Sequence, residues 1–232
     1  MKMKTIGDLF PGARFLVLTG NYGSGKTEIA LNLALQFAGA ERTTLVDLDI
    51  VNPYFRSGEK AEALEAAGIR VLMPTFALTT VDIPALPAEI QSVFEMPSDR
   101  VIMDVGGDDT GAAALGRYYP SFMSHREETK VALIINGMRP LTGTKEDVLD
   151  LADRIQCRGR LRIDLVINNT NLAGETTPGM VEAGEQLALE CADALGIPQV
   201  MTAGMPEILE KCRLQTALIP IRRQMKPEWM DA

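Results

Sequence analysis

The sequence predicts an α/β fold in which a doubly wound, mainly parallel sheet of about seven strands is the middle layer of a three-layer α/β/α arrangement. Short apolar runs rich in β-branched residues alternate with helix-like segments along nearly the whole chain. In addition, runs such as VALII at residues 131–135 are apolar at every position, as expected for strands that helices cover on both faces.

The individual elements follow from this alternation. The expected strands lie at 14–20, 43–49, 69–74, 100–105, 130–136, 162–168 and 199–203. The expected helices lie at 26–39, 58–67, 84–94, 108–124, 144–157, 178–195 and 206–213. In the first helix Ile29, Leu33 and Phe37 recur at every fourth residue and form one apolar face. Because no long linker interrupts the pattern, we expect residues 1–232 to form a single domain, with a core from about 14 to about 212 and a short C-terminal tail.

Composition limits the classes of function. A net charge of −8 and an isoelectric point of about 4.8 argue against a nucleic-acid-binding protein that works through overall positive charge. No stretch approaches the roughly 18 consecutive apolar residues of a membrane-spanning helix. The three cysteines are widely spaced, which is typical of the reducing cytoplasm. We therefore expect a cytoplasmic protein that binds neither nucleic acid nor membrane.

A glycine-rich segment at the end of the first expected strand predicts a phosphate-binding loop. Residues 20–27, GNYGSGKT, fit the pattern G-x-x-x-x-G-K-[ST]. Glycines let successive N–H groups and the following helix N-terminus point toward phosphate oxygens. We expect Lys26 to reach the β- and γ-phosphates as a catalytic residue, and the Thr27 hydroxyl to ligate Mg²⁺. The alternative is a glycine turn with an exposed lysine. The predicted nucleotide-binding residues of this segment are Gly20, Asn21, Tyr22, Gly23, Ser24, Gly25, Lys26, Thr27 and Glu28.

Aspartates follow two further expected strands. Asp47 and Asp49 are two residues apart and therefore share a face. Asp49 is nearer the tip, where we expect it to orient the attacking water as a catalytic residue or to hold a water of the Mg²⁺ shell, while Asp47 supports the phosphate loop. Alternatively, one of the two caps the following turn. Asp104 is expected to hold Mg²⁺, and Gly106 or Gly107 to contact the γ-phosphate and let the loop move when that phosphate leaves.

Three asparagines follow the sixth expected strand, and a side-chain amide there can read a purine through its donor and acceptor groups. We expect Asn168 and Asn169 to do so, with Asn171 nearby. Guanine-specific sites carry the pattern N-K-x-D, whose aspartate is absent from NNTN, so adenine is favoured. The alternative is that the asparagines are turn residues. In the last loop, Met205 and Pro206 are expected to close over the base.

With the phosphate loop, DLD, DVGG and the strand-end asparagines in this order, the chain resembles the SIMIBI-class P-loop ATPases. More narrowly, from about residue 14 to about 212 it looks like the CobQ/CobB/MinD/ParA nucleotide-binding family. That resemblance implies the P-loop NTPase fold, binding of ATP and Mg²⁺, and functional roles for Lys26, Thr27, Asp49 and Asp104. It also implies a homodimer that forms face to face when ATP is bound.

One position departs from the family's pattern. The MinD/ParA-type loop, GKGGxGKT, carries a second lysine that reaches the phosphates of the partner subunit, and Asn21 occupies that place here. Arg56 and Arg139 are candidates to replace it.

Three functions remain open from the sequence. The leading hypothesis is a Mg²⁺-dependent ATPase switch whose nucleotide state controls a partner protein of unknown identity. The second is an ATP-dependent small-molecule synthase or kinase that phosphorylates a substrate carboxylate, with Arg56, Arg117 and Arg139 as candidate substrate ligands. The third is a nucleotide-binding interaction module with little turnover.

Overall fold

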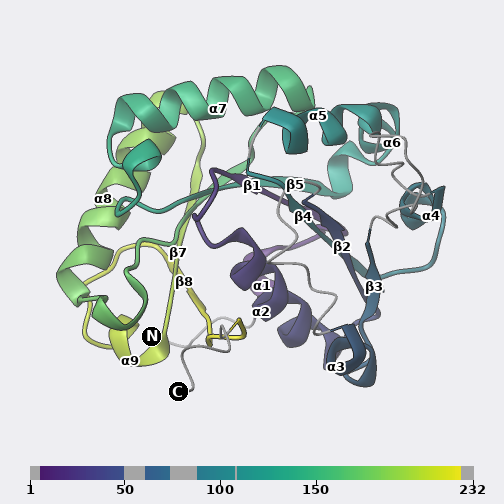
Figure 1. Ribbon diagram of the computed structural model, residues 1–232, viewed down its shortest axis with the longest axis horizontal. Helices are drawn as coiled ribbons and strands as arrows, with labels where there is room; N and C mark the ends of the chain where they lie inside the picture. The colour runs from purple at the N-terminus through teal and green to yellow at the C-terminus, as the bar shows by residue number, and fades with distance from the viewer. Residues whose placement is uncertain (1–5, 50–60, 74–87, 108, 226–232) are drawn as a thin grey trace, which may run out of the picture.

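A single parallel sheet organises the chain, as the computed structural model shows for residues 6–49, 61–73, 88–107 and 109–225 (Figure 1). Its eight strands are all parallel and lie in the order β3-β2-β4-β1-β5-β6-β7-β8. The strands are β1 (Phe15–Gly20), β2 (Thr43–Leu48), β3 (Arg70–Leu72), β4 (Arg100–Val105), β5 (Thr129–Ile135), β6 (Leu165–Asn168), β7 (Gln199–Gly204) and β8 (Ala217–Pro220).

Helices connect the strands. The α-helices of the described residues are α1 (Ile6–Leu9), α2 (Lys26–Ala38), α3 (Ala61–Ala66), α4 (Ala88–Gln91), α5 (Asp109–Arg117), α6 (Tyr119–Ser124), α7 (Lys145–Gly159), α8 (Pro178–Leu195) and α9 (Pro206–Leu209). Short 3₁₀ turns lie at η3 (Ser92–Phe94), η4 (Arg126–Glu128), η5 (Pro140–Thr142) and η6 (Ala173–Glu175).

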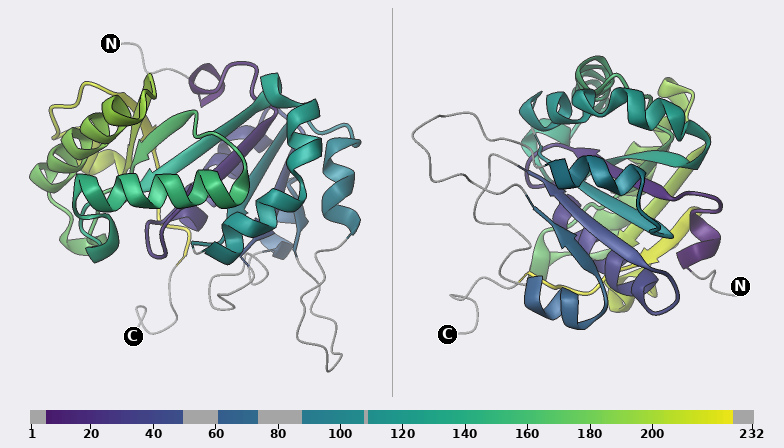
Figure 2. Two further views of the ribbon diagram at one scale, coloured as in Figure 1. Left: turned by 90° about the horizontal axis from the view of Figure 1, so that it is seen from above. Right: turned by 90° about the vertical axis from the view of Figure 1, so that its right-hand side faces the viewer.

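The helices form two layers, one on each face of the sheet (Figures 1 and 2). Strand alternation assigns Phe15 and Val17 of β1 to the core under α5, α6, α7 and α8, and Leu16 and Leu18 to the core under α1, α2 and α3. All residues of β1, β2 and β4 are buried, so the apolar runs in the sequence correspond to strands covered on both faces, as predicted.

The chain reverses its direction across the sheet at β1. From β1 it passes through α2 to β2 on one side, whereas from β4 it passes through α5 and α6 to β5 on the other side of β1. In open parallel sheets, ligands bind beyond the carboxyl ends of the strands at such a reversal. The loops after β1 and β4 therefore lie where a ligand is expected.

The predicted α/β class is confirmed, and the differences from the predicted elements have local causes. The sheet has an eighth strand, β8, which was not expected because ALIP is only four residues long and ends in proline. The helix expected at 108–124 is divided between α5 and α6 at Tyr118, which is not helical. The helix expected at 206–213 ends at Leu209, and parts of those expected at 58–67 and 84–94 lie outside the described residues.

Candidate nucleotide site

The loop between β1 and α2 has the backbone shape that its glycines predict. Gly20, Gly23 and Gly25 have φ angles of 145°, 73° and 87°, in the region that residues with a side chain avoid. A Cβ at Gly20 would overlap the carbonyl oxygen of Ile134, and one at Gly25 would overlap the amide of Asn169. Glycine is therefore required by conformation and by close packing.

The two residues after Gly25 begin α2 and face the loop. The Lys26 side chain is only 7 % exposed, and its Nζ donates to the carbonyl oxygen of Asn21 at 2.9 Å. Gly25 has no side chain with which to cap α2, so the positive end of the helix dipole and its first N–H groups face the loop without a capping oxygen. This arrangement places an ammonium group and backbone donors around one concavity, as phosphate binding requires.

Asp104 of β4 lies across from the first turn of α2. Its Oδ2 accepts a hydrogen bond of 2.6 Å from the Thr27 hydroxyl. Burial raises the pKa of Asp104 to about 6, although the charge of Lys26 and the Thr27 hydrogen bond lower it, and the nearby Asp49 raises it further. A buried carboxylate with a hydroxyl beside it is the ligand pair that Mg²⁺ takes in phosphate loops.

Two buried side-chain oxygens in the described part of the chain have no hydrogen-bond partner: Asp104 Oδ1 and Ser24 Oγ. Such atoms are rare in native proteins and need an explanation. Both belong to this site, one on the carboxylate beside Thr27 and the other inside the loop. The residues therefore fit a nucleotide with its Mg²⁺, with Thr27 and Asp104 toward the cation and Ser24, Lys26 and the loop backbone toward the phosphates.

Asp47 and Asp49 both lie near the carboxyl edge but differ in role. Asp47 Oδ1 accepts from the Asp49 backbone N–H at 2.8 Å, so Asp47 caps the turn after β2, which was the alternative interpretation. Asp49 lies against the β4 loop, where a Cβ added to Gly106 would be 3.2 Å from its Oδ1. Its predicted catalytic and metal roles stay predictions.

The glycine pair after β4 packs on the phosphate loop. A Cβ on Gly107 would overlap the backbone of Asn21 and Tyr22, and one on Gly111 would overlap the backbone of Gly106. The β4–α5 turn thus rests directly on the loop through positions where only glycine fits. A movement of one loop would therefore displace the other. A switch segment requires such mechanical coupling.

Asn169 and Arg139 contact the phosphate loop from the segments that follow strands β6 and β5. The Asn169 amide Nδ2 donates to the carbonyl oxygen of Ser24 at 2.8 Å, and Arg139 Nε donates to that of Gly23 at 3.2 Å. Asn169 is 2 % exposed, whereas Arg139 is exposed. Sequence reasoning named both residues but missed this contact, because the parallel pairing of β1, β5 and β6 that creates it is not visible in the local sequence.

Asn168 is not positioned to read a base. Its side chain is fully buried, its Nδ2 donates to the Val181 carbonyl oxygen at 3.1 Å, and its Oδ1 accepts from the Thr170 N–H at 3.0 Å. Asn171 likewise donates to the carbonyl oxygen of Asn169 at 2.7 Å. These asparagines order the turn after β6, which was the alternative interpretation.

The remaining predicted residues are dispersed. The Glu28 carboxylate accepts from the backbone N–H groups of Gln224 and Met225, so its side chain binds the C-terminal segment. Met205 and Pro206 begin α9 directly after β7, at the same edge of the sheet, and their contact with a base stays a prediction. Arg117 is exposed in the last turn of α5. Arg56 lies outside the described residues.

Comparisons with known proteins agree with this geometry at the level of the fold. No family model and no curated protein sequence matches the chain. Among solved structures, the nucleotide-binding protein from Archaeoglobus fulgidus in complex with ADP is 16 % identical, with a TM-score of 0.51 over 89 % of this chain and 88 % of that one. The signal recognition particle 54 kDa protein from Aeropyrum pernix K1 in complex with GDP is 22 % identical, with a TM-score of 0.53 over 87 % of this chain.

A third similar structure is the cell division protein FtsY from Thermotoga maritima, 20 % identical, with a TM-score of 0.51 over 87 % of this chain. The chain covers only 44 % of the Aeropyrum protein and 65 % of FtsY. None of the helices described is long and apolar enough to cross a membrane. The all-parallel sheet with a glycine-rich loop after β1 is the α/β fold of P-loop NTPases, and the chain shares this fold with these three structures.

Proposed function

We propose that the protein binds ATP with Mg²⁺ at the β1–α2 loop and uses the state of the nucleotide to control a partner protein. The observation that carries this proposal is the pair of unsatisfied buried oxygens, Ser24 Oγ and Asp104 Oδ1, on either side of Lys26 and Thr27. A bound nucleotide and its cation would satisfy both. Adenine is preferred over guanine because NNTN, at the end of β6, lacks the aspartate of guanine-specific sites.

The switch role rests on the contacts between loops. Asp49 follows β2, Gly106 and Gly107 follow β4, and all three lie against one another or against Tyr22 of the phosphate loop. A γ-phosphate held by Lys26 would fix these loops, and its release would free them, as in other γ-phosphate switches. Asp49 is the residue proposed to orient the attacking water, which is the usual task of a carboxylate at this position.

Arg139 is the proposed replacement for the lysine that Asn21 lacks. Its exposed guanidinium lies beside Gly23 of the same chain, which supports the proposal that it supplies positive charge to the phosphates without a second subunit. We propose that dimerisation, if nucleotide induces it, is not needed to complete the charge around the phosphates. Mass measured by light scattering, with and without non-hydrolysable ATP, tests whether the protein dimerises.

The test of the switch is phosphate release measured with ATP alone and with candidate small acids. Release with ATP alone that Asp49→Ala reduces at least tenfold supports an ATPase switch, since tenfold corresponds to about 1.4 kcal/mol of lost transition-state stabilisation. Release that occurs only with an added acid would indicate a small-molecule synthase or kinase instead. Tight ATP binding without release under any condition would indicate a binding module.

A further inference from the structure

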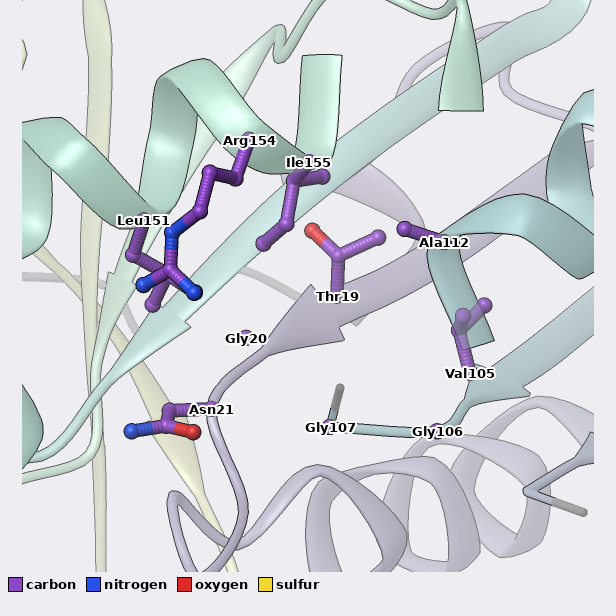
Figure 3. A pocket seen from close by; sticks show the side chains of 10 residues that line it. All are labelled: Thr19, Gly20, Asn21, Val105, Gly106, Gly107, Ala112, Leu151, Arg154 and Ile155. Carbon is purple, nitrogen blue, oxygen red and sulfur yellow. The ribbon is translucent and has the colours of Figure 1, made fainter. Parts of the chain in front are cut away.

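A cavity of about 260 Å³ lies between the phosphate loop, the loop after β4 and the helices α5 and α7 (Figure 3). Its floor contains Thr19 of β1 and Val105 of β4. Asp104 immediately precedes Val105 in β4 and so points to the other face of the sheet. The strand alternation therefore separates this cavity from the proposed Mg²⁺ position. It lies between α5 and α7, in the helical layer that does not contain α2.

The wall of the cavity is apolar, with one cation at its edge. Ala112 of α5 and Leu151 and Ile155 of α7 supply apolar surface. Arg154 extends from α7 toward Gly20, and its guanidinium lies between Leu151 and the end of β1 (Figure 3). A guanidinium beside an apolar wall is suited to a ligand that combines a carboxylate with a short hydrocarbon body.

One partner of Arg154 is the exposed carboxylate of Asp150 on the same helix. Its Nε lies 3.0 Å from Asp150 Oδ2, one helical turn earlier, and the two side chains are 52 % and 70 % exposed. Exposed pairs of this kind contribute little. A ligand carboxylate that accepts two hydrogen bonds from the guanidinium in a partly apolar cavity is held more strongly than an exposed side chain.

The rim of the cavity is shared with the proposed nucleotide site. Gly20 and Asn21 of the phosphate loop, and Gly106 and Gly107 after β4, line it, and Gly107 packs directly on the backbone of Asn21 and Tyr22. A molecule in the cavity would contact both loops, which under the proposed function are held together by the γ-phosphate. Its affinity must then depend on the nucleotide, and the affinity of the nucleotide must depend on it by the same factor.

We propose that this cavity is a second ligand site, for a small organic acid whose carboxylate pairs with Arg154 and whose hydrocarbon body lies on Val105, Leu151 and Ile155. Its volume is slightly below the roughly 300–1,000 Å³ of pockets for drug-sized ligands, so the ligand is much smaller than a nucleotide. The acid is an effector that is coupled to the nucleotide through the shared glycine rim. The coupling rests on the proposed nucleotide binding, whereas the site itself does not.

The experiment measures binding of butyrate, glutarate and benzoate by saturation-transfer NMR and calorimetry, first without nucleotide. Butyramide and benzamide serve as uncharged analogues of the same shape. We expect at least one acid to bind with a dissociation constant of about 1 mM or lower, and its amide to bind at least tenfold more weakly. Arg154→Met should weaken the acid at least tenfold, whereas Arg158→Met, on the same helix outside the cavity, should not. Ala112→Leu, which fills the cavity, should abolish binding while the melting temperature shows that the protein is folded.

The proposal is wrong if none of the three acids binds, or if binding is unchanged in Arg154→Met. It is also wrong if Arg154→Met weakens ATP without any acid binding, because Arg154 would then serve the nucleotide. Repeating the acid titration in Lys26→Ala separates the two proposals, since the acid site should survive the loss of nucleotide binding. In the wild-type protein, an acid affinity that is the same with and without Mg²⁺-ATP would contradict the coupling.

Discussion

Asp104 combines burial, an unsatisfied oxygen and a raised pKa at one position. Its pKa of about 6 is above the ordinary value of 3.8, mainly because burial disfavours the charged form. The folded protein therefore binds this proton more tightly than the unfolded chain. The ionised carboxylate then lowers the stability of the metal-free protein progressively as pH rises from about 4 through about 6.

We predict that Asp104→Asn raises the melting temperature of the metal-free protein at pH 8 and gives little gain at pH 4, because the buried charge it removes exists only at the higher pH. Thermal unfolding followed by circular dichroism with a chelator present measures this. Asp99→Asn is the control, for which we expect the opposite change in melting temperature. The hydrogen bonds from Arg42 lower the pKa of Asp99 to about 2, so its loss should slightly lower the melting temperature at pH 8. A lower melting temperature of Asp104→Asn at pH 8 would contradict the account of Asp104.

Asn169 offers a test that separates base reading from support of the loop. If its bond to Ser24 braces the phosphate loop, Asn169→Ala should weaken ATP and GTP by the same factor, about tenfold for one buried hydrogen bond of roughly 1.4 kcal/mol. Calorimetric titration of both nucleotides provides the measurement. Loss of discrimination between ATP and GTP, without an equal loss of affinity for both, would return Asn169 to its sequence-predicted role.

At the residue scale, functional residues that are adjacent in the sequence could be predicted. Contacts between side chains that follow different strands could not. Residues 20–27 are one motif, so the glycines, Lys26 and Thr27 could be identified without a structure. Thr27 and Asp104 were each predicted as a Mg²⁺ ligand, and the structure joins them by a hydrogen bond. The internal bonds of Asn168 and the capping by Asp47 depend on side-chain directions, which composition and spacing do not specify.

At the scale of elements, the end of β8 and the segment after it are bound to α2 by a row of side chains. Glu28, Asn32 and Gln36 are spaced four residues apart and so lie on one face of α2. Asn32 Nδ2 donates to the carbonyl oxygen of Arg222 at 2.8 Å, and Asn32 Oδ1 accepts from its N–H at 2.7 Å. The predicted C-terminal tail is therefore partly an edge of the core. The contact between Asn32 and the C-terminal segment could not be predicted from the sequence, because a polar residue on a helix usually faces solvent.

We predict that Asn32→Ala lowers the free energy of unfolding by about 2 kcal/mol, because a buried side chain is lost and the N–H and carbonyl of Arg222 lose their partners. Urea unfolding gives this quantity. Gln36→Ala is the matched control, since exposed Gln36 donates a single bond within the described residues, to the carbonyl oxygen of Pro220. Equal effects of the two substitutions would show that the C-terminal segment is not held by Asn32.

At the scale of the whole molecule, the reversal of chain direction at β1 explains why the candidate functional residues lie together at one edge of the sheet. The chain leaves β1 and β4 on opposite faces of the sheet, so the two glycine loops meet above their carboxyl ends. The phosphate loop, the carboxylates and the cavity between α5 and α7 are all arranged around this meeting point. The class of fold could be predicted because alternation along the chain determines it, whereas the strand order and the edge strand β8 required the structure.

The most direct test of the central claim is calorimetric titration of the wild-type protein with Mg²⁺ and non-hydrolysable ATP, compared with Lys26→Ala. We expect saturable binding with one nucleotide per chain and a loss of at least a hundredfold in affinity in the variant, or about 2.7 kcal/mol. Lys130→Ala is the control, because Lys130 is near the amino end of β5, at the opposite edge of the sheet. Unchanged binding in Lys26→Ala, with the variant folded, would contradict the assignment of the β1–α2 loop as the nucleotide site.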